Sequence, residues 1–170
     1  MIKVSKLTLR SSSFDSLRTA GLKVCIDTNV IISAEVFGGV CDEVLDLVIE
    51  RKIKNVTSLF ILIEVAKVLD KKFEKGEDEI KETLSLIADI STLVKTKTKI
   101  RALSYNPDNE ILACATEGKV DYLVTGDKKH LLKLKEYKGI KILSPGQFLK
   151  AIVTDKQKLE RLPALLKSGS

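Results

Sequence analysis

The sequence has a single histidine and three cysteines among its 170 residues, and these shortages exclude several kinds of site. We expect the one histidine, His130, on the solvated surface. A typical zinc site needs more histidine or cysteine ligands than this chain offers together, and no arrangement of residues resembles a Ser-His-Asp triad. The cysteines, Cys25, Cys41 and Cys114, are far apart and form no C-x-x-C pair. An odd number of separated cysteines favours buried free thiols in a reducing compartment.

Long apolar runs and a concentrated charge are also missing. No stretch approaches the ~18–20 apolar residues that cross a bilayer, and the first twenty residues have no apolar core of a secretory signal. We therefore expect a cytoplasmic protein with no membrane contact. The net charge of +6 is mostly terminal, since residues 1–21 carry four basic and one acidic side chain and residues 154–170 carry four and two. The charge alone is thus weak evidence for a nucleic-acid partner.

Short apolar runs alternate with helical patterns along the chain. We predict strands at 22–26, 56–57, 90–96, 122–125 and 140–143, and helices at 30–37, 40–50, 58–72, 79–88, 106–117, 128–132 and 145–153. Apolar runs of this length between helices are typical of buried parallel strands. The sequence therefore predicts a three-layer α/β/α fold with a central parallel sheet of four or five strands. It also predicts an N-terminal extension (1–21), one domain (22–153) and a C-terminal tail (154–170).

Two of the predicted strands end in a carboxylate. Asp27 follows the strand at 22–26, and Asp127 follows the strand at 122–125. In a parallel sheet the carboxyl ends of the strands share an edge, and ligands bind there where the strand order reverses. Each aspartate could instead cap the helix that follows it. Together, Asp27 and Asp127 suggest a site for a divalent cation. Asp121 precedes the later strand, so it should lie at the opposite edge of the sheet and outside this site.

Glu64 is a third candidate, on a predicted helix. It is the only charged residue in the segment 58–66, and helical spacing places it on one face with Phe60, Ile61 and Val68. A carboxylate on an apolar face is costly unless it is paired or bound to a cation. The alternative is a glutamate at the rim of the core that is paired with a lysine.

Asp108 is the fourth candidate, in the first turn of a helix for which we predict Asn106 as the cap and Pro107 as the first helical residue. An acidic residue there is also stabilised by the helix dipole, by about 0.3–1 kcal/mol. Mg2+ and Mn2+ prefer oxygen ligands and retain several waters, so a few carboxylates suffice to bind them. The predicted metal ligands and catalytic residues are Asp27, Glu64, Asp108 and Asp127.

In order along the chain, these residues match the motifs of a known family. Asp27-Thr28-Asn29 ends the first strand, Glu64 follows a Ser-capped apolar helix start, and Asp108-Asn109 opens an Ala-rich helix. Residues 121–127 read Asp-Tyr-Leu-Val-Thr-Gly-Asp, and residues 142–149 match the closing strand and helix. Over about residues 22–153 the chain resembles the PIN-domain nucleases, and most closely the toxin components of toxin–antitoxin systems.

The resemblance implies a Mg2+- or Mn2+-dependent ribonuclease that acts on single-stranded or structured RNA. The four carboxylates would hold the metal and position the attacking water. Asn29 and Thr125 would form hydrogen bonds to these ligands or to the water. The resemblance also implies a homodimer and a small antitoxin protein that covers the site.

Other interpretations fit the residues less well. A response-regulator receiver needs an acidic pair after the first strand and an aspartate after the third, but Cys25 and Ile26 precede Asp27 and no aspartate ends the strand at 90–96. A phosphatase with an Asp-x-Asp-x-Thr nucleophile needs a second aspartate where this chain has Asn29. The alternative of a catalytically inactive PIN-like module that binds RNA or protein remains open.

Overall fold

The computed structural model describes residues 21–154, and the predicted segments 1–21 and 154–170 lie outside this range except for one boundary residue each. The strands are β1 (Lys23–Ile26), β2 (Lys54–Ser58), β3 (Ser91–Val94), β4 (Tyr122–Val124), β5 (Glu136–Tyr137) and β6 (Ile140–Leu143). The helices are α1 (Thr28–Phe37), α2 (Val40–Ile49), α3 (Leu59–Phe73), α4 (Glu77–Asp89), α5 (Asn106–Glu117) and α6 (Leu131–Leu134), and a final helix at 145–154. Between residues 21 and 154, none of the helices combines the length and the apolarity that a membrane span requires.

Six strands form one sheet in the order β3-β2-β1-β4-β6-β5. Five of them pair in parallel, and β5 is antiparallel to β6. The predicted α/β fold with a parallel sheet of four or five strands is confirmed, and the sheet has one further, antiparallel strand that was not predicted, β5. Its two residues, Glu136 and Tyr137, are too few to show the alternation by which a strand is recognised.

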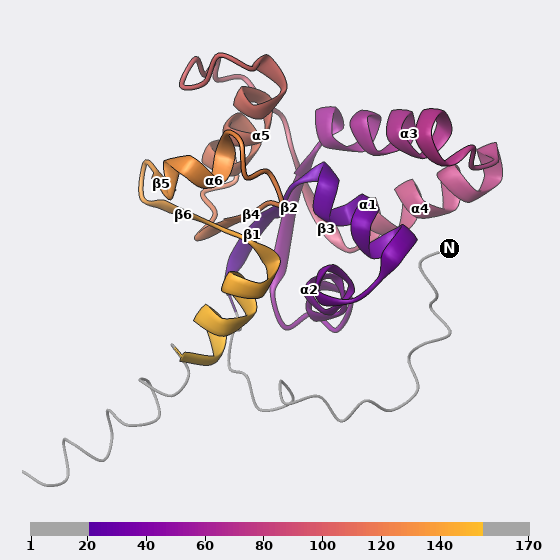
Figure 1. The fold of residues 1–170 in the computed structure, drawn as a ribbon, viewed down its shortest axis with the longest axis horizontal. Helices are drawn as coiled ribbons and strands as arrows, with labels where there is room; N and C mark the ends of the chain where they lie inside the picture. Colours follow the sequence, from indigo (N-terminus) through magenta and orange to yellow (C-terminus); the bar gives the residue numbers. More distant parts are fainter. Residues whose placement is uncertain (1–20, 155–170) are drawn as a thin grey trace, which may run out of the picture.

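Helices cover both faces of the sheet (Figure 1). The connections from β1 to β2 and from β2 to β3 run in one direction across the sheet, and the connection from β3 to β4 runs back. Right-handed crossovers therefore place α1 to α4 on one face and α5 and α6 on the other, as Figure 1 shows. The direction reverses between the neighbouring strands β1 and β4, so their carboxyl ends flank the switch point where such folds bind ligands.

The central strands are buried because helices pack on both of their faces. Val24, Cys25 and Ile26 of β1 are fully buried, and every residue of β4 is buried. On one face α5 packs against these strands through small buried side chains, among them Ala113 and Cys114. The three cysteines are free thiols, and two of them are buried in this contact between helix and sheet.

Two helix starts have side-chain cap hydrogen bonds. Ser58 Oγ accepts a backbone N–H of α3 at 3.4 Å, and Ser144 and Gln147 form the capping box of the final helix. The predicted Asn106 cap is wrong. α5 begins at Asn106 itself, and the preceding Tyr105 makes no side-chain cap hydrogen bond.

Gly118, at the end of α5, lies against β2, where an added Cβ would come within 2.5 Å of Val56 Cγ1. We predict that Gly118→Ala lowers the free energy of unfolding by about 1–3 kcal/mol, because the methyl group forces the helix end or buried Val56 to move. Denaturant titration measures the change. In the matched control Gly76→Ala the new Cβ meets nothing within 4 Å, so the change should stay below about 1 kcal/mol. Equal losses in the two variants would contradict the packing argument.

Candidate metal centre

The carboxyl ends of β1 and β4 lie side by side at the switch point. Ile26 pairs with Val124, so the residues that follow the two strands leave the sheet at the same level. The backbone N–H of Asp27 donates to the Val124 carbonyl at 2.9 Å, which extends the pairing by one step. This pairing brings the side chains of Asp27 and Thr125 together.

Hydrogen bonds hold the carboxylate of Asp27 in place. Thr125 Oγ1 donates to Asp27 Oδ2 at 2.5 Å, and Asn29 Nδ2 donates to the same oxygen. Asn29 Oδ1 accepts from the Gly126 backbone N–H at 2.7 Å, which ties the loop after β4 to α1. A Cβ at position 126 would lie 2.9 Å from that oxygen, so this close approach requires glycine. The alternative role of Asp27 as a cap is wrong, since its side chain makes no cap hydrogen bond to α1.

Asp127 organises the turn that follows β4, but it is not the N-cap of a helix at 128–132, because α6 begins at Leu131 and its N-cap is His130. Asp127 Oδ1 accepts from the Lys129 N–H at 2.9 Å, and Asp127 Oδ2 accepts from the N–H groups of His130 at 3.1 Å and Leu131 at 3.0 Å. Burial pushes the pKa of Asp127 upward, but the backbone hydrogen bonds and the charge of His130 hold the pKa below its ordinary value. Asp127 is therefore ionised at neutral pH.

The same turn carries His130 into the cleft. His130 Nδ1 lies 3.1 Å from Asp108 Oδ2 and 3.3 Å from Asp127 Oδ2, and its ring stacks on Tyr105 with centroids 5.7 Å apart. The His130 side chain is 41% exposed, so the prediction of a solvated histidine is correct in part, but its contacts with the cleft carboxylates were not predicted. Sequence reasoning missed this residue, and the signal that could have found it is its position three residues after Asp127, in a turn that Asp127 organises.

Asp108 approaches from the first turn of α5, on the other face of the sheet. The residue is 6% exposed, and its Oδ2 accepts no hydrogen bond from the residues in the described range. Asn109 fixes the preceding loop, because its side chain accepts from the Leu103 N–H at 3.0 Å and donates to the carbonyls of Leu103 and Tyr105 at 2.8 and 3.3 Å. Burial, together with the charge of Asp127, raises the pKa of Asp108.

Glu64 reaches the cleft from α3. Ile61, Val65 and Leu69 form the buried stripe of this helix, whereas Glu64 and Val68 are half-buried and line the cleft. The sequence placed Glu64 on the apolar face itself, and the structure places it at the edge of that face. No hydrogen bond or ion pair joins the Glu64 carboxylate to another residue between 21 and 154. Within this range Glu64 therefore has no lysine partner, which was the alternative interpretation of this residue.

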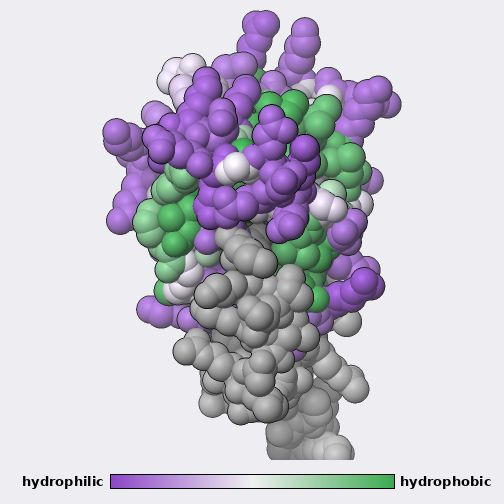
Figure 2. Space-filling view, turned by 90° about the vertical axis from the view of Figure 1, so that its right-hand side faces the viewer, coloured by the Kyte–Doolittle hydropathy of each residue, from purple (hydrophilic) through white to green (hydrophobic). Residues whose placement is uncertain are grey.

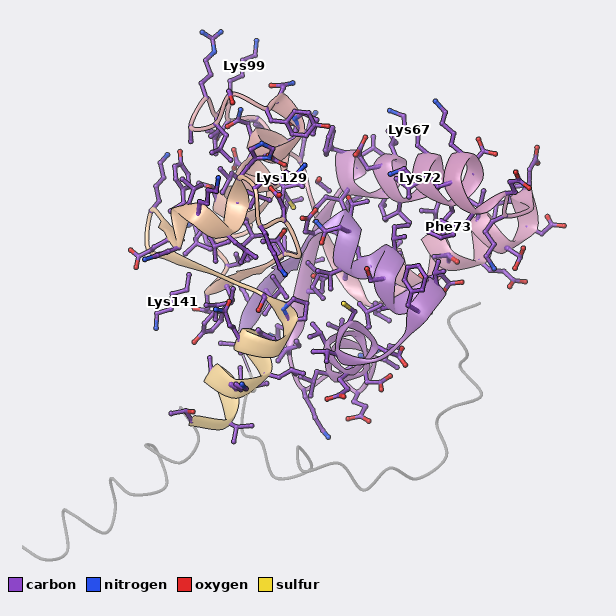
Figure 3. All side chains as sticks on the ribbon, in the orientation of Figure 1. Lys67, Lys72, Phe73, Lys99, Lys129 and Lys141 are labelled. Atoms are coloured by element: carbon purple, nitrogen blue, oxygen red, sulfur yellow. The ribbon has the colours of Figure 1, made fainter. Side chains whose placement is uncertain are left out.

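All four predicted carboxylates line one cleft of about 790 Å³. α3 forms one wall, where Lys72 and Phe73 lie, and the turn with Lys129 forms part of the opposite wall (Figure 3). Asp108, Asp127 and His130 each offer one ligand atom, and these three atoms lie within 4.8 Å of one another. The structure thus brings the four candidates together, and their metal-binding and catalytic roles stay predictions.

The electrostatics of the cleft fit a divalent cation. Burial raises the pKa of Asp27 to about 6, with the hydrogen bond from Thr125 opposing the shift and the charge of Asp108 adding to it. A cation stabilises ionised carboxylates that burial disfavours, and it also compensates a buried carboxylate oxygen that has no hydrogen-bond donor, such as Asp108 Oδ2. Carboxylate oxygens are the ligands that Mg2+ and Mn2+ prefer, so the residues present fit either ion.

The raised pKa of Asp27 predicts how the stability of the metal-free protein depends on pH. An unfolded aspartate has a pKa of about 3.9, so the folded state binds more protons than the unfolded state between about pH 4 and pH 6. Lowering the pH from about 7.5 to about 5 should therefore raise the free energy of unfolding by about 1 kcal/mol. Urea titrations in EDTA measure this gain. Asp27→Asn should show less of it, and identical pH profiles would assign the effect to other groups.

Comparison with known proteins identifies the family. A family model of the PIN domain matches residues 23–129. The uncharacterised protein MJ1680 of Methanocaldococcus jannaschii is 36% identical over an alignment of 126 residues, and the match covers 71% of this chain and 81% of that protein. The residues that the family model matches include all four carboxylates.

Two solved structures share the fold at low sequence identity. VapBC2 from Rickettsia felis, bound to a DNA fragment from its promoter, aligns with a TM-score of 0.54 and 16% identity over 71% of this chain and 97% of the matched chain. VapBC-1 from nontypeable Haemophilus influenzae aligns with a TM-score of 0.52 and 15% identity over 74% and 99%. The fold agrees with the family match, and the chain belongs to the PIN-domain family.

Proposed function

We propose that this protein is a Mg2+- or Mn2+-dependent endoribonuclease that hydrolyses phosphodiester bonds in RNA. PIN domains are generally nucleases. The observation that carries the proposal is the convergence of carboxylates from four separate segments on one cleft at the switch point of the sheet. Carboxylates gathered at such an edge suit a divalent cation, and metal-assisted hydrolysis is the chemistry that such a centre supports.

Each residue of the cleft has a role in the proposed reaction. Asp27, Asp108 and Asp127 would hold the ion, which when bound polarises a phosphoryl oxygen and lowers the pKa of water. Thr125 and Asn29 keep the Asp27 carboxylate in one orientation through their hydrogen bonds to Oδ2. Glu64, on the facing wall, would accept a hydrogen bond from the attacking water and orient it.

Exposed lysines on both sides of the cleft support a polyanionic substrate. Lys72 lies on the α3 wall and Lys129 on the opposite wall, and Lys67 and Lys99 project at the upper edge of the molecule in Figure 3. These lysines form no ion pair within the described part of the chain. Unpaired cations beside an acidic centre suit a phosphate backbone that passes over the bound ion. The choice of RNA over DNA follows the family resemblance.

We also propose a toxin that an antitoxin protein silences by covering the cleft. The two similar solved structures are VapBC toxin–antitoxin complexes. Phe37 is 74% exposed at the end of α1, and its ring contacts Phe73 of the cleft wall with centroids 6.1 Å apart. Figure 2 shows the face at this end of the molecule, which is largely hydrophilic with apolar patches between. An exposed aromatic ring beside the cleft offers such a partner an anchor. The homodimer and the cytoplasmic location stay predictions from the sequence.

The alternative is a PIN-like module that binds RNA or protein without cleaving it. The two functions differ in their need for a cation, because hydrolysis requires the ion in the cleft whereas binding through surface lysines does not.

We predict that the full chain cleaves single-stranded RNA in the presence of Mn2+ and that EDTA abolishes cleavage. Asp108→Asn should lower the single-turnover rate by at least about a hundredfold, because the cation loses a charged ligand. Glu64→Gln should lower the rate comparably while the free energy of unfolding changes by less than about 0.5 kcal/mol, since the half-buried carboxylate has no partner to lose. Gel assays and denaturant titrations measure the two effects.

Asp121→Asn is the matched control for these variants. Asp121 lies at the opposite end of β4, is exposed, and accepts a hydrogen bond from the Lys23 N–H at 2.8 Å, which an asparagine oxygen can also accept. This variant should cleave at the wild-type rate. Equal rates in all variants would reveal a contaminating nuclease, and RNA binding with no Mn2+-dependent cleavage would favour the inactive module.

A further inference from the structure

His130 lies in the cleft, yet the reaction proposed above gives it no part. We propose that His130 is a metal ligand, so that a ring nitrogen and carboxylate oxygens together hold the cation at the switch point. The inference rests on the proposed function, since it concerns the same cation. It extends the four-carboxylate centre to a mixed nitrogen and oxygen centre.

The distances around His130 match those between neighbouring ligands of a single ion. Nδ1 lies 3.1 Å from Asp108 Oδ2 and 3.3 Å from Asp127 Oδ2. An octahedral cation with bonds of about 2.1 Å separates adjacent ligand atoms by about 3.0 Å. All three ligand atoms lie within 4.8 Å of one another, so one ion can reach all of them.

The oxygen of Asp108 that faces His130 points independently to a cation. Asp108 is 6% exposed, and its Oδ2 accepts no hydrogen bond from residues 21–154, although His130 Nδ1 lies beside it. A buried carboxylate oxygen without a donor destabilises the fold by roughly 1–3 kcal/mol or more. An ion shared by Asp108, Asp127 and His130 would compensate this cost.

The surroundings of His130 hold its ring in position before any ion binds. The ring stacks on Tyr105 with an interplanar angle of 25°, and the backbone N–H of His130 donates to Asp127 Oδ2 at 3.1 Å. The backbone of Tyr105 is held in turn, because its carbonyl accepts from Asn109 Nδ2 at 3.3 Å. A ligand that is already oriented loses less conformational freedom on binding, which strengthens the affinity for the ion.

A nitrogen ligand changes which ions the centre prefers. Carboxylate oxygen suits Mg2+ and Mn2+ alike, whereas imidazole nitrogen suits first-row transition ions, whose affinities rise from Mn2+ to Co2+. His130 should therefore favour Mn2+ and Co2+ over Mg2+ in this chain.

Pulsed electron paramagnetic resonance of bound Mn2+ tests the ligand directly. The full chain contains one histidine, so a protein prepared without a histidine tag can show an imidazole 14N coupling only from His130. We expect this coupling in the wild type and its loss in His130→Gln. Bound Mn2+ with no 14N coupling in the wild type would overturn the inference while leaving the proposed nuclease intact.

Calorimetric titration of the metal supplies a second test. His130→Gln should weaken Mn2+ binding by about ten- to a hundredfold and Mg2+ binding much less, because Mg2+ gains little from nitrogen. Asp121→Asn is the control, since it neutralises an exposed carboxylate at the opposite end of β4, so it should retain both the 14N coupling and the affinity. Unchanged or tighter Mn2+ binding in His130→Gln would make His130 a counter-ion that the metal displaces, and would overturn the inference. No Mn2+ binding to the wild type would overturn the proposed function and this inference together.

Discussion

The pairing of β1 with β4 determines where the polar groups of the cleft lie. These parallel strands are neighbours in register, so the residues after Ile26 and Val124 emerge together from the sheet. Crossovers on opposite faces leave the space above this point open, because the chain turns away from it in both directions. Asp27 and Asp127 occupy that space, and Thr125 bonds to both, through the Asp27 carboxylate and the Asp127 N–H. The cleft is therefore a consequence of strand order.

The three aspartates of the cleft differ in their surroundings, and their pKa values shift accordingly. Burial acts to raise the pKa of all three, but at Asp127 the backbone N–H groups and the charge of His130 together outweigh burial and lower the pKa, whereas at Asp27 and Asp108 burial prevails. The apolar core beneath them supplies the stability that lets the chain tolerate these charges without neutralising them. A divalent cation would remove that cost, so the fold is complete without the ion but electrostatically strained at one edge.

The sequence predicted the positions of the site-bearing elements better than the details within them. Asp27 and Asp127 were placed correctly because apolar runs mark buried parallel strands whose ends share an edge. Glu64 was assigned to the right helix but too deep in its apolar face, since helical spacing gives a direction and not a depth of burial. His130 was missed because its position depends on a turn organised by backbone hydrogen bonds to Asp127, and hydrophobic periodicity carries no information about such a turn. The antiparallel β5 was missed for a related reason, its length of two residues.

Asp127 serves both the turn and the cleft, and this double role bears on how related chains diverge. Its carboxylate accepts three backbone N–H groups, so a descendant that had lost all activity would still need an acceptor there to shape the segment between β4 and α6. Asp108 has no comparable structural role. Its buried Oδ2 accepts no hydrogen bond within the described residues and destabilises the fold unless a cation binds there. As selection for activity relaxes, Asp108 should be replaced before Asp127. A relative that retains Asp108 is therefore more strongly indicated to act on a substrate than one that retains only Asp127.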